Sequence, residues 1–213
     1  MNEKEIFIEL YKKGLIKTLK DRPEGWKLVS GIWSPFYIQL RNLPSYPALM
    51  KKIGSMLSKK ISNKGNKLLG IAMAGIPIAT AISLSSNIPM CYTRKIVSKE
   101  YGEHSLVEGE MEDGDRFIAV DDIVTKFDSK LKAINQLYEE AKRRKIKVEC
   151  NYVAVVIDRE QGGEEIARKH GIKLISIIKF KEAIEILKEE MNDMEYEIIK
   201  DYLNNPEKYQ HGL

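Results

Sequence analysis

Residues 117–125 read FIAVDDIVT, and this stretch decides how the rest of the chain is interpreted. Four apolar residues lead directly into the adjacent carboxylates of Asp121 and Asp122. Two neighbouring carboxylates after a buried strand must each be solvated, hydrogen-bonded or paired, because burying an isolated charge is costly. We therefore expect an apolar strand that runs into an acidic loop, residues 120–125, where a ligand binds.

Short apolar strands alternate with amphipathic helices around this stretch. The sequence predicts strands at 68–72, 90–92, 116–120, 152–157 and 174–178, and helices at 46–60, 77–84, 130–144, 164–170 and 180–203, the last broken near Asn192. This alternation predicts an α/β fold with a mainly parallel central sheet and helices on both faces. Ligands of such sheets bind outside the carboxyl ends of the strands, where the acidic pair lies. Before this region, residues 3–19 have near-helical apolar spacing and residues 26–40 read as extended.

The composition is that of a folded protein, with 43% hydrophobic and 31% charged residues. No apolar run is long enough to cross a bilayer, and the charged N-terminus does not read as a secretory signal. Cys91 and Cys150 are too few for a disulfide framework. These features predict a cytoplasmic protein with no membrane partner. The formal net charge of +4 is mildly basic and does not require nucleic acid as a partner.

The residues after the acidic pair suit a phosphorylated sugar. Thr125 to Ser129 lead into a predicted helix, and hydroxyls and backbone N–H groups at a helix N-terminus suit a phosphate. The carboxylates suit vicinal hydroxyls or a hydrated Mg²⁺. The alternative is that Asp128 or Ser129 only caps the helix and that Asp121 belongs to a turn.

This block resembles the fingerprint of the type I phosphoribosyltransferases. That fingerprint is a hydrophobic strand, two acidic residues, two further residues, and then Thr-Thr-Gly-x-Ser or Thr. Residues 120–125 match it, and Ser129 matches its end. Lys126 and Phe127 stand where the family has its second Thr and its Gly, so the loop for phosphoribosyl pyrophosphate (PRPP) is divergent.

Four further blocks resemble one subfamily, the orotate phosphoribosyltransferases, and they follow in the family's order. Residues 30–41 resemble its N-terminal signature, although Val29 and Gln39 replace a Lys and an Asp. Residues 70–81 resemble its pyrophosphate-binding turn and helix. Residues 93–102 resemble its mobile catalytic loop, with one extra residue. Residues 156–163 resemble the stretch in which an Arg meets the orotate ring.

The resemblance implies a single phosphoribosyltransferase-like domain over residues 1–213, with a small N-terminal hood at about 1–45 and a core at about 46–213. It implies transfer of the phosphoribosyl group from PRPP to orotate, giving orotidine 5′-monophosphate and pyrophosphate. It also implies a homodimer and a Mg²⁺ cofactor held through PRPP and water near the acidic pair. The implied catalytic residues are Lys99, Asp121 and Asp122, and the implied substrate-binding residues are Arg94, Lys95, Ala74, Gly75, Thr125, Lys126, Asp128, Ser129, Arg159, Phe36 and Tyr37.

The residue types support these roles on chemical grounds. Cations such as Lys99 can stabilise a departing pyrophosphate, and the planar fork of Arg159 suits a carboxylate. The competing interpretations are a solvated loop for the cations, a surface ion pair for Arg159, and core packing for Phe36 and Tyr37 in place of stacking on a pyrimidine.

Two other functions stay open at this point. One is a phosphoribosyltransferase for another base. The other is a non-catalytic, regulatory homologue that binds PRPP or a nucleotide, which the divergent residues Lys126 and Phe127 favour. The presence of Lys99 and Arg159 favours a retained active site.

Overall fold

The computed structural model describes residues 2–28, 33–95 and 105–209. At its centre lies a six-stranded sheet in the order β10-β9-β8-β5-β6-β7, parallel throughout except for β7. The strands are β5 (Lys67–Gly70), β6 (Met90–Thr93), β7 (Val107–Glu108), β8 (Arg116–Val124), β9 (Glu149–Asp158) and β10 (Lys173–Lys179). The predicted mainly parallel sheet is therefore confirmed.

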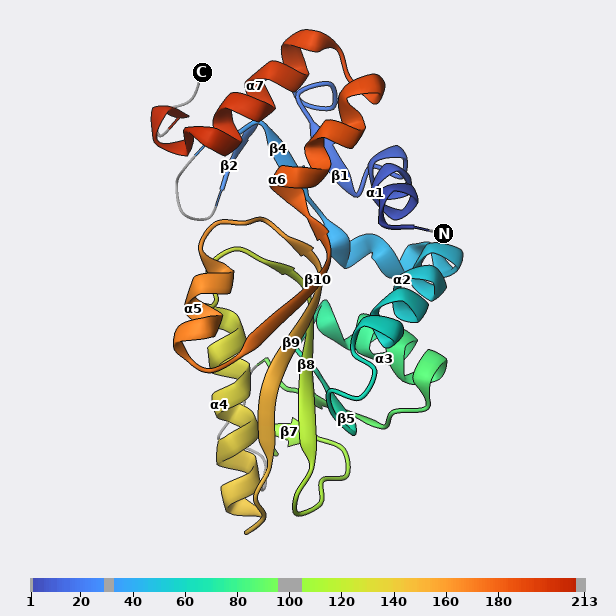
Figure 1. Ribbon diagram of the computed structural model, residues 1–213, viewed down its shortest axis with the longest axis vertical. Coiled ribbons are helices and arrows are strands. Elements are labelled where there is room, and N and C mark those ends of the chain that lie inside the picture. Colours follow the sequence, from blue (N-terminus) through green and yellow to red (C-terminus); the bar gives the residue numbers. More distant parts are fainter. Residues whose placement is uncertain (1, 29–32, 96–104, 210–213) are drawn as a thin grey trace.

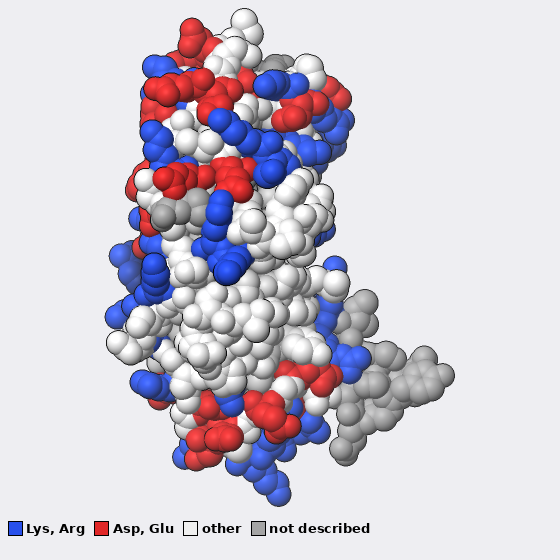
Figure 2. All heavy atoms as spheres, turned by 90° about the vertical axis from the view of Figure 1, so that its right-hand side faces the viewer, with Lys and Arg blue, Asp and Glu red and all other residues white. Residues whose placement is uncertain are grey.

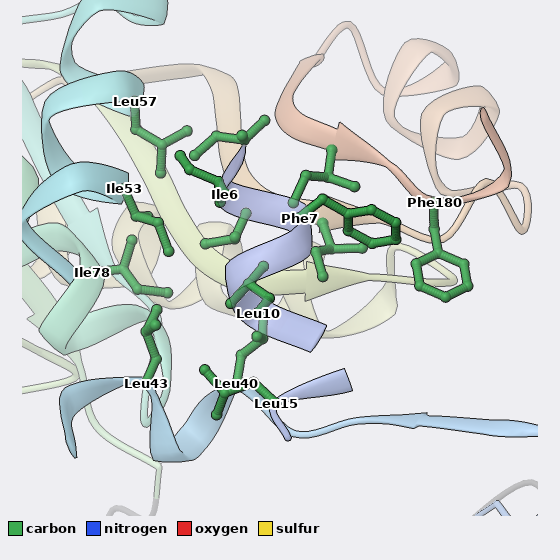
Figure 3. Close-up of a cluster of buried hydrophobic side chains, with 14 of the residues drawn as sticks. Ile6, Phe7, Leu10, Leu15, Leu40, Leu43, Ile53, Leu57, Ile78 and Phe180 are labelled. Atoms are coloured by element: carbon green, nitrogen blue, oxygen red, sulfur yellow. The ribbon is translucent and has the colours of Figure 1, made fainter. Parts of the chain in front are cut away.

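Helices cover both faces of this sheet, as predicted. Figure 1 shows α2 (Pro47–Lys60) and α3 (Gly75–Ser86) on one side of the strands, and α4 (Asp128–Arg143) and α5 (Gly163–Lys169) on the other. The first face also receives α1 (Glu3–Lys12), whose apolar side chains pack against α2 and α3 in Figure 3. In the described part of the chain, no helix combines the length and the apolar character needed to span a membrane.

The strand β8 is longer than the sequence predicts, and the acidic pair lies inside it. Pairing with β9 continues through Asp121, Ile123 and Val124, which are opposite Val155, Ile157 and Asp158. On the other side, β5 ends at Gly70 opposite Val120. The expected acidic loop is thus a strand extension with one unpaired edge. The sequence prediction failed here because two adjacent Asp residues are unfavourable in strands, whereas the pairing with β9 holds them extended.

Two small antiparallel strand pairs form the hood. In the first pair β1 (Ile16–Thr18) lies beside β4 (Phe36–Ile38), and in the second β2 (Trp26–Lys27) lies beside β3 (Trp33–Ser34). The expected helical segment 3–19 is wrong in its second half, because α1 ends at Lys12 and the positive φ of Gly14 turns the chain into β1. A short 3₁₀ helix, η1 (Leu40–Ser45), then leads into α2.

The C-terminal segment, residues 180–209, lies beside the hood at the upper end of Figure 1. It comprises α6 (Phe180–Ala183), η2 (Ile184–Glu190), α7 (Asp193–Asn204) and η3 (Pro206–Tyr209). The ring centroids of Phe180 and Phe36 are 4.5 Å apart, which joins the segment to β4. The predicted break near Asn192 is confirmed. The side chain of Asn192 accepts a hydrogen bond from the backbone N–H of Glu195 at the start of α7. The division at about residue 45 stays a prediction.

Candidate functional site

The two carboxylates of the acidic pair have different surroundings. Asp121 is buried and its Oδ2 lies 2.8 Å from Nζ of Lys130, whose side chain is also buried. The same Nζ donates hydrogen bonds to the carbonyl of Ile123 at 2.5 Å and to Oγ of Ser129 at 3.3 Å. Asp121 is thus neutralised from within the protein, by a lysine in the first turn of α4.

Among the described residues, no lysine forms an ion pair with Asp122. Its Oδ1 accepts a hydrogen bond from the backbone N–H of Ile123 at 2.8 Å, and its N–H donates to Oδ1 of Asp121 at 2.9 Å. Burial, reinforced by the charge of Asp121, raises the pKa of Asp122 to about 7. This partly buried carboxylate at the open edge of β8 is suited to accept hydrogen bonds from hydroxyl groups of a ligand.

The N-terminus of α4 lies directly beyond β8 and offers free donors. No hydrogen-bond partner is found among the described residues for the backbone N–H groups of Lys126, Phe127, Asp128 and Ser129. Thr125 is partly buried, and the side chains of Lys126, Asp128 and Ser129 are exposed. Unpaired N–H groups at the positive end of a 16-residue helix form a natural anion site.

Phe127 does not fill this anion site. Its side chain is 0% exposed and packs in the core between the sheet and α4, with Leu137 and Val155 in the same apolar cluster. Its φ of −85° is one that any residue can adopt. The backbone here therefore does not need the conformational freedom of the glycine that the family fingerprint has at this position.

A turn of small residues approaches β8 from the neighbouring strand. A Cβ atom at Gly75 would lie 2.1 Å from the carbonyl oxygen of Val120, so only glycine fits there. The N–H of Ile71 donates to that same oxygen at 2.9 Å, and the N–H of Ala72 donates to Oγ1 of Thr93 at 3.0 Å. Ala74, partly buried, precedes α3. These contacts place the turn beside the acidic pair.

Arg159 lies one residue beyond β9 at the same edge of the sheet, and its N–H donates to the carbonyl of Val124 at 3.0 Å. The residue is 9% exposed, and the centre of its guanidinium lies 4.9 Å from the ring centroid of Phe36. Within the described residues, neither Nε nor Nη2 has a hydrogen-bond partner. Burial lowers the pKa of Arg159, yet the residue remains a cation at neutral pH.

The remaining candidates lie around this edge or beyond it. Phe36 is buried beneath Arg159, whereas Tyr37 is partly buried and stacks on Trp26 with centroids 6.1 Å apart. Nη1 of Arg94 lies 3.2 Å from Oε1 of Glu108, and Lys95 is exposed. Lys99 lies outside the described residues. The structure thus brings several of the predicted residues to one edge of the sheet: Gly75, Asp121, Asp122, Thr125 to Ser129, and Arg159. The roles assigned to them stay predictions.

Lys130 was missed by the analysis of the sequence, although a signal was present. It stands three, four and seven residues before Ala133, Ile134 and Leu137, which are all buried on α4. This spacing places a lysine on the apolar face of a helix, nine residues after Asp121. A cation on such a face indicates a buried partner.

The carboxyl of Asp122 gives a first prediction, about pH. Its folded pKa of about 7 exceeds the ordinary value of 3.8 for an Asp carboxyl, so near neutral pH the folded protein keeps a proton that the unfolded chain has lost. Its contribution to stability should therefore decrease between about pH 4 and pH 7 and then level off. We expect Asp122→Asn to raise the free energy of unfolding at pH 8 by about 1–3 kcal/mol, with little change at pH 4.

Urea unfolding of both proteins at pH 4 and pH 8, followed by circular dichroism, measures this difference. Glu139→Gln, an exposed carboxylate on α4, is the control and should leave the pH dependence unchanged. Equal stability of the wild type and Asp122→Asn at both pH values would contradict the prediction.

The pair of Asp121 and Lys130 gives a second prediction. Lys130→Met leaves the carboxylate of Asp121 buried without its cation, and we expect a loss of about 3–5 kcal/mol in the free energy of unfolding. Asp121→Asn combined with Lys130→Met removes both charges and should recover a large part of that loss. Guanidinium denaturation checks both, with the exposed Lys132→Met as the control on the same helix. A single variant as stable as the wild type would show that the pair is dispensable.

Comparisons with known proteins show what this chain is similar to. No family model matches the chain. An orotate phosphoribosyltransferase of Staphylothermus marinus is 34% identical over 203 residues, which cover 94% of each chain. One from Methanocaldococcus jannaschii is 31% identical over 175 residues, covering 80% of this chain and 96% of the relative.

Two solved structures have a fold similar to that of this chain. The structure of orotate phosphoribosyltransferase from Aeropyrum pernix matches with a TM-score of 0.71 and 26% identity, over 84% of this chain and 96% of that one. The structure of Leishmania donovani UMP synthase matches with a TM-score of 0.81 and 25% identity, over 95% of this chain but 42% of that longer one. With its type I phosphoribosyltransferase fold, the chain belongs to the orotate phosphoribosyltransferase family.

Proposed function

We propose that the protein transfers the phosphoribosyl group of PRPP to orotate, forming orotidine 5′-monophosphate and releasing pyrophosphate. The observation that carries this proposal is the shared edge of the sheet. There lie the acidic pair, the N-terminus of α4 and Arg159, and within the described residues the N–H groups of 126–129 and Nε and Nη2 of Arg159 have no hydrogen-bond partner. Relatives 31–34% identical over most of the chain bear this enzyme's name.

The sugar phosphate end of PRPP suits the segment from β8 to α4. The N–H groups of residues 126–129 can donate to the 5′-phosphate, with the exposed Lys126 and the hydroxyl of Ser129 beside them. The carboxylate of Asp122 can accept hydrogen bonds from the ribose hydroxyls. Phe127 is no obstacle to this arrangement, because its side chain lies in the core. This placement argues against a regulatory protein that has lost its phosphate site.

The base end suits Arg159. A guanidinium presents Nε and Nη2 as one planar edge, which binds a carboxylate through two parallel hydrogen bonds. This edge of Arg159 has no partner among the described residues. A buried, unsatisfied cation strongly favours a ligand that brings a carboxylate, because an unpaired buried donor is costly. Orotate carries a carboxylate and most other pyrimidine and purine bases do not, which favours orotate over the alternative of another base.

The reaction needs stabilisation of charge on the leaving pyrophosphate. The turn at Ala74 and Gly75 lies against β8 beside the acidic pair, and Arg94, Lys95 and Lys99 bring positive charge in the sequence that follows it. We infer that Mg²⁺, bound through the substrate near the acidic pair, offsets further negative charge. Asp122 fits this role as an acceptor for water of a hydrated ion, while Asp121 stays paired with Lys130.

We place the protein in the cytoplasm.

We propose a homodimer that buries the outer face of α3. This helix has no charged residue between Gly75 and Ser86, yet Leu84 is 80% exposed, and Met73 just before the helix is 68% exposed. Figure 2 looks at this side of the molecule and shows a broad uncharged area at mid-height. An uncharged area that includes large exposed apolar side chains suits a contact with another protein.

Activity is tested by the loss of orotate ultraviolet absorbance when PRPP and Mg²⁺ are added. We expect turnover by the wild type, and a fall of at least about 100-fold in kcat for Lys99→Ala with the fold intact. Lys132→Ala, an exposed lysine on α4, serves as the control. Turnover with a different base alone would favour the first alternative, and tight PRPP binding without turnover would favour the regulatory protein. An unchanged rate in Lys99→Ala would remove that residue's role.

The dimer is tested by sedimentation velocity. We expect the wild type to sediment with a mass twice the 24.4 kDa of one chain. Leu84→Glu should sediment as a monomer, because the substitution would bury a charge in the contact. Met194→Glu alters a methionine of α7 that is 75% exposed, and it should leave the dimer intact. A wild-type monomer at micromolar concentration would refute this assembly.

A further inference from the structure

Both neighbours of Arg159 in the chain carry a carboxylate, and both carboxylates accept hydrogen bonds from the backbone. Oδ1 of Asp158 accepts from the N–H of Glu160 at 2.8 Å. Oε2 of Glu160 accepts from the N–H groups of Lys181 and Glu182, at 2.7 and 3.3 Å. Nε and Nη2 of Arg159 have no partner among the described residues, so neither flanking carboxylate occupies that edge of the guanidinium.

The backbone of Glu160 has a left-handed conformation, with a φ of 56°. A residue with a Cβ atom adopts this conformation at a cost, because the Cβ atom crowds a backbone carbonyl oxygen. The bond from its own N–H and the two bonds onto its carboxylate offset that cost. The turn directly after Arg159 is thus stabilised by the side chain of Glu160 itself.

The contacts of Glu160 lead back to Arg159 through two aromatic rings. The N–H groups that bind the carboxylate of Glu160 belong to α6, whose first residue is Phe180. The rings of Phe180 and Phe36 have centroids 4.5 Å apart, and the guanidinium of Arg159 lies 4.9 Å from the ring centroid of Phe36. The turn that follows Arg159 and the ring that supports its guanidinium are therefore both fastened to the start of α6.

This attachment restricts the backbone of Arg159 from both sides. The N–H of Arg159 donates to the carbonyl of Val124 at 3.0 Å, which ties the residue to β8. Glu160 ties the next residue to α6. A guanidinium receives a carboxylate through two parallel hydrogen bonds only in a narrow range of orientations. A backbone that is already held in place reduces the freedom that such a ligand must remove on binding.

We propose that Glu160 is a positioning residue for orotate. It fastens the turn after β9 to α6 and so holds the Nε–Nη2 edge of Arg159 in the orientation that receives the carboxylate of the base. The inference rests on the proposed function. Glu160 acts through Arg159 and contacts no reacting atom, so the loss of its side chain should weaken the binding of orotate and leave the chemical step unchanged.

The first test compares Glu160→Ala with Glu160→Gln. Both hydrogen bonds from α6 end on the single oxygen Oε2, so the carbonyl oxygen of a glutamine can accept them in its place. For Glu160→Ala we expect the KM for orotate to rise about tenfold, with kcat and the KM for PRPP within about twofold of the wild type. For Glu160→Gln we expect all three constants to stay within about threefold. Equal effects of the two variants on the KM for orotate would overturn the inference.

Glu160→Gly keeps the test decisive if Glu160→Ala does not fold. Glycine adopts a positive φ without the cost of a Cβ atom, but it lacks the acceptor for α6. We therefore expect the same rise in the KM for orotate, and a value within about twofold of the wild type would contradict the proposal. Glu165→Ala, which removes an exposed carboxylate in the first turn of α5, is the matched control and should leave all three constants unchanged.

A double variant separates positioning from general support of the fold. The planar fork is absent in an Arg159→Lys background, so Glu160→Ala should there change the dissociation constant for orotate, measured by calorimetry, by less than about twofold. An effect of about fivefold or more in that background would show that Glu160 acts independently of Arg159 and would overturn the inference.

Orotate binding by calorimetry, measured on the single variants, separates this inference from the proposed function. A wild type that turns over orotate, with Glu160→Ala and Glu160→Gly indistinguishable from it, overturns the inference alone. A wild type that binds orotate without turnover, and binds it more weakly after Glu160→Ala, overturns the proposed function and supports the inference. A wild type that neither binds nor converts orotate overturns both.

Discussion

Two carboxylates held side by side at the end of a buried strand impose the main constraint on this molecule. Neither can lose its water without a compensating partner. The two carboxylates are compensated in different ways. Asp121 forms an ion pair with the buried ammonium of Lys130, whereas the pKa of Asp122 rises to about 7. The first turn of α4 brings Lys130 to this pair, and its apolar face packs on the sheet. Its free N–H groups are thereby set beside the same two carboxylates.

Much of the fold could be predicted from the sequence, because buried parallel strands and amphipathic helices leave distinct periodic patterns. The sheet, both helical layers and the break near Asn192 followed from those patterns. The extension of β8 through Asp121 and Asp122 did not, since strand propensity argues against adjacent carboxylates and the pairing with Val155 and Ile157 is a long-range effect.

The candidate site was predicted in part, for similar reasons. Asp121, Asp122 and Arg159 each follow an apolar run, so their arrival at one edge is a consequence of parallel strands. The consequence of Phe127 could not be judged without knowing which way its side chain points, and it points into the core. The packing of Tyr202 on Trp33 and Phe36 left no usable signal, because these residues lie about 170 positions away along the chain.

The pairing of the hood with the C-terminal segment also bears on the order in which the molecule is made. A chain emerges from the ribosome N-terminus first, so Phe36 is available long before Phe180 and Tyr202, on which its ring packs. The central strands and their helices can assemble during that interval, but the aromatic cluster around Phe36 cannot. A nascent chain that stops before α7 is therefore expected to hold the sheet without the aromatic packing that joins the hood to the C-terminal segment.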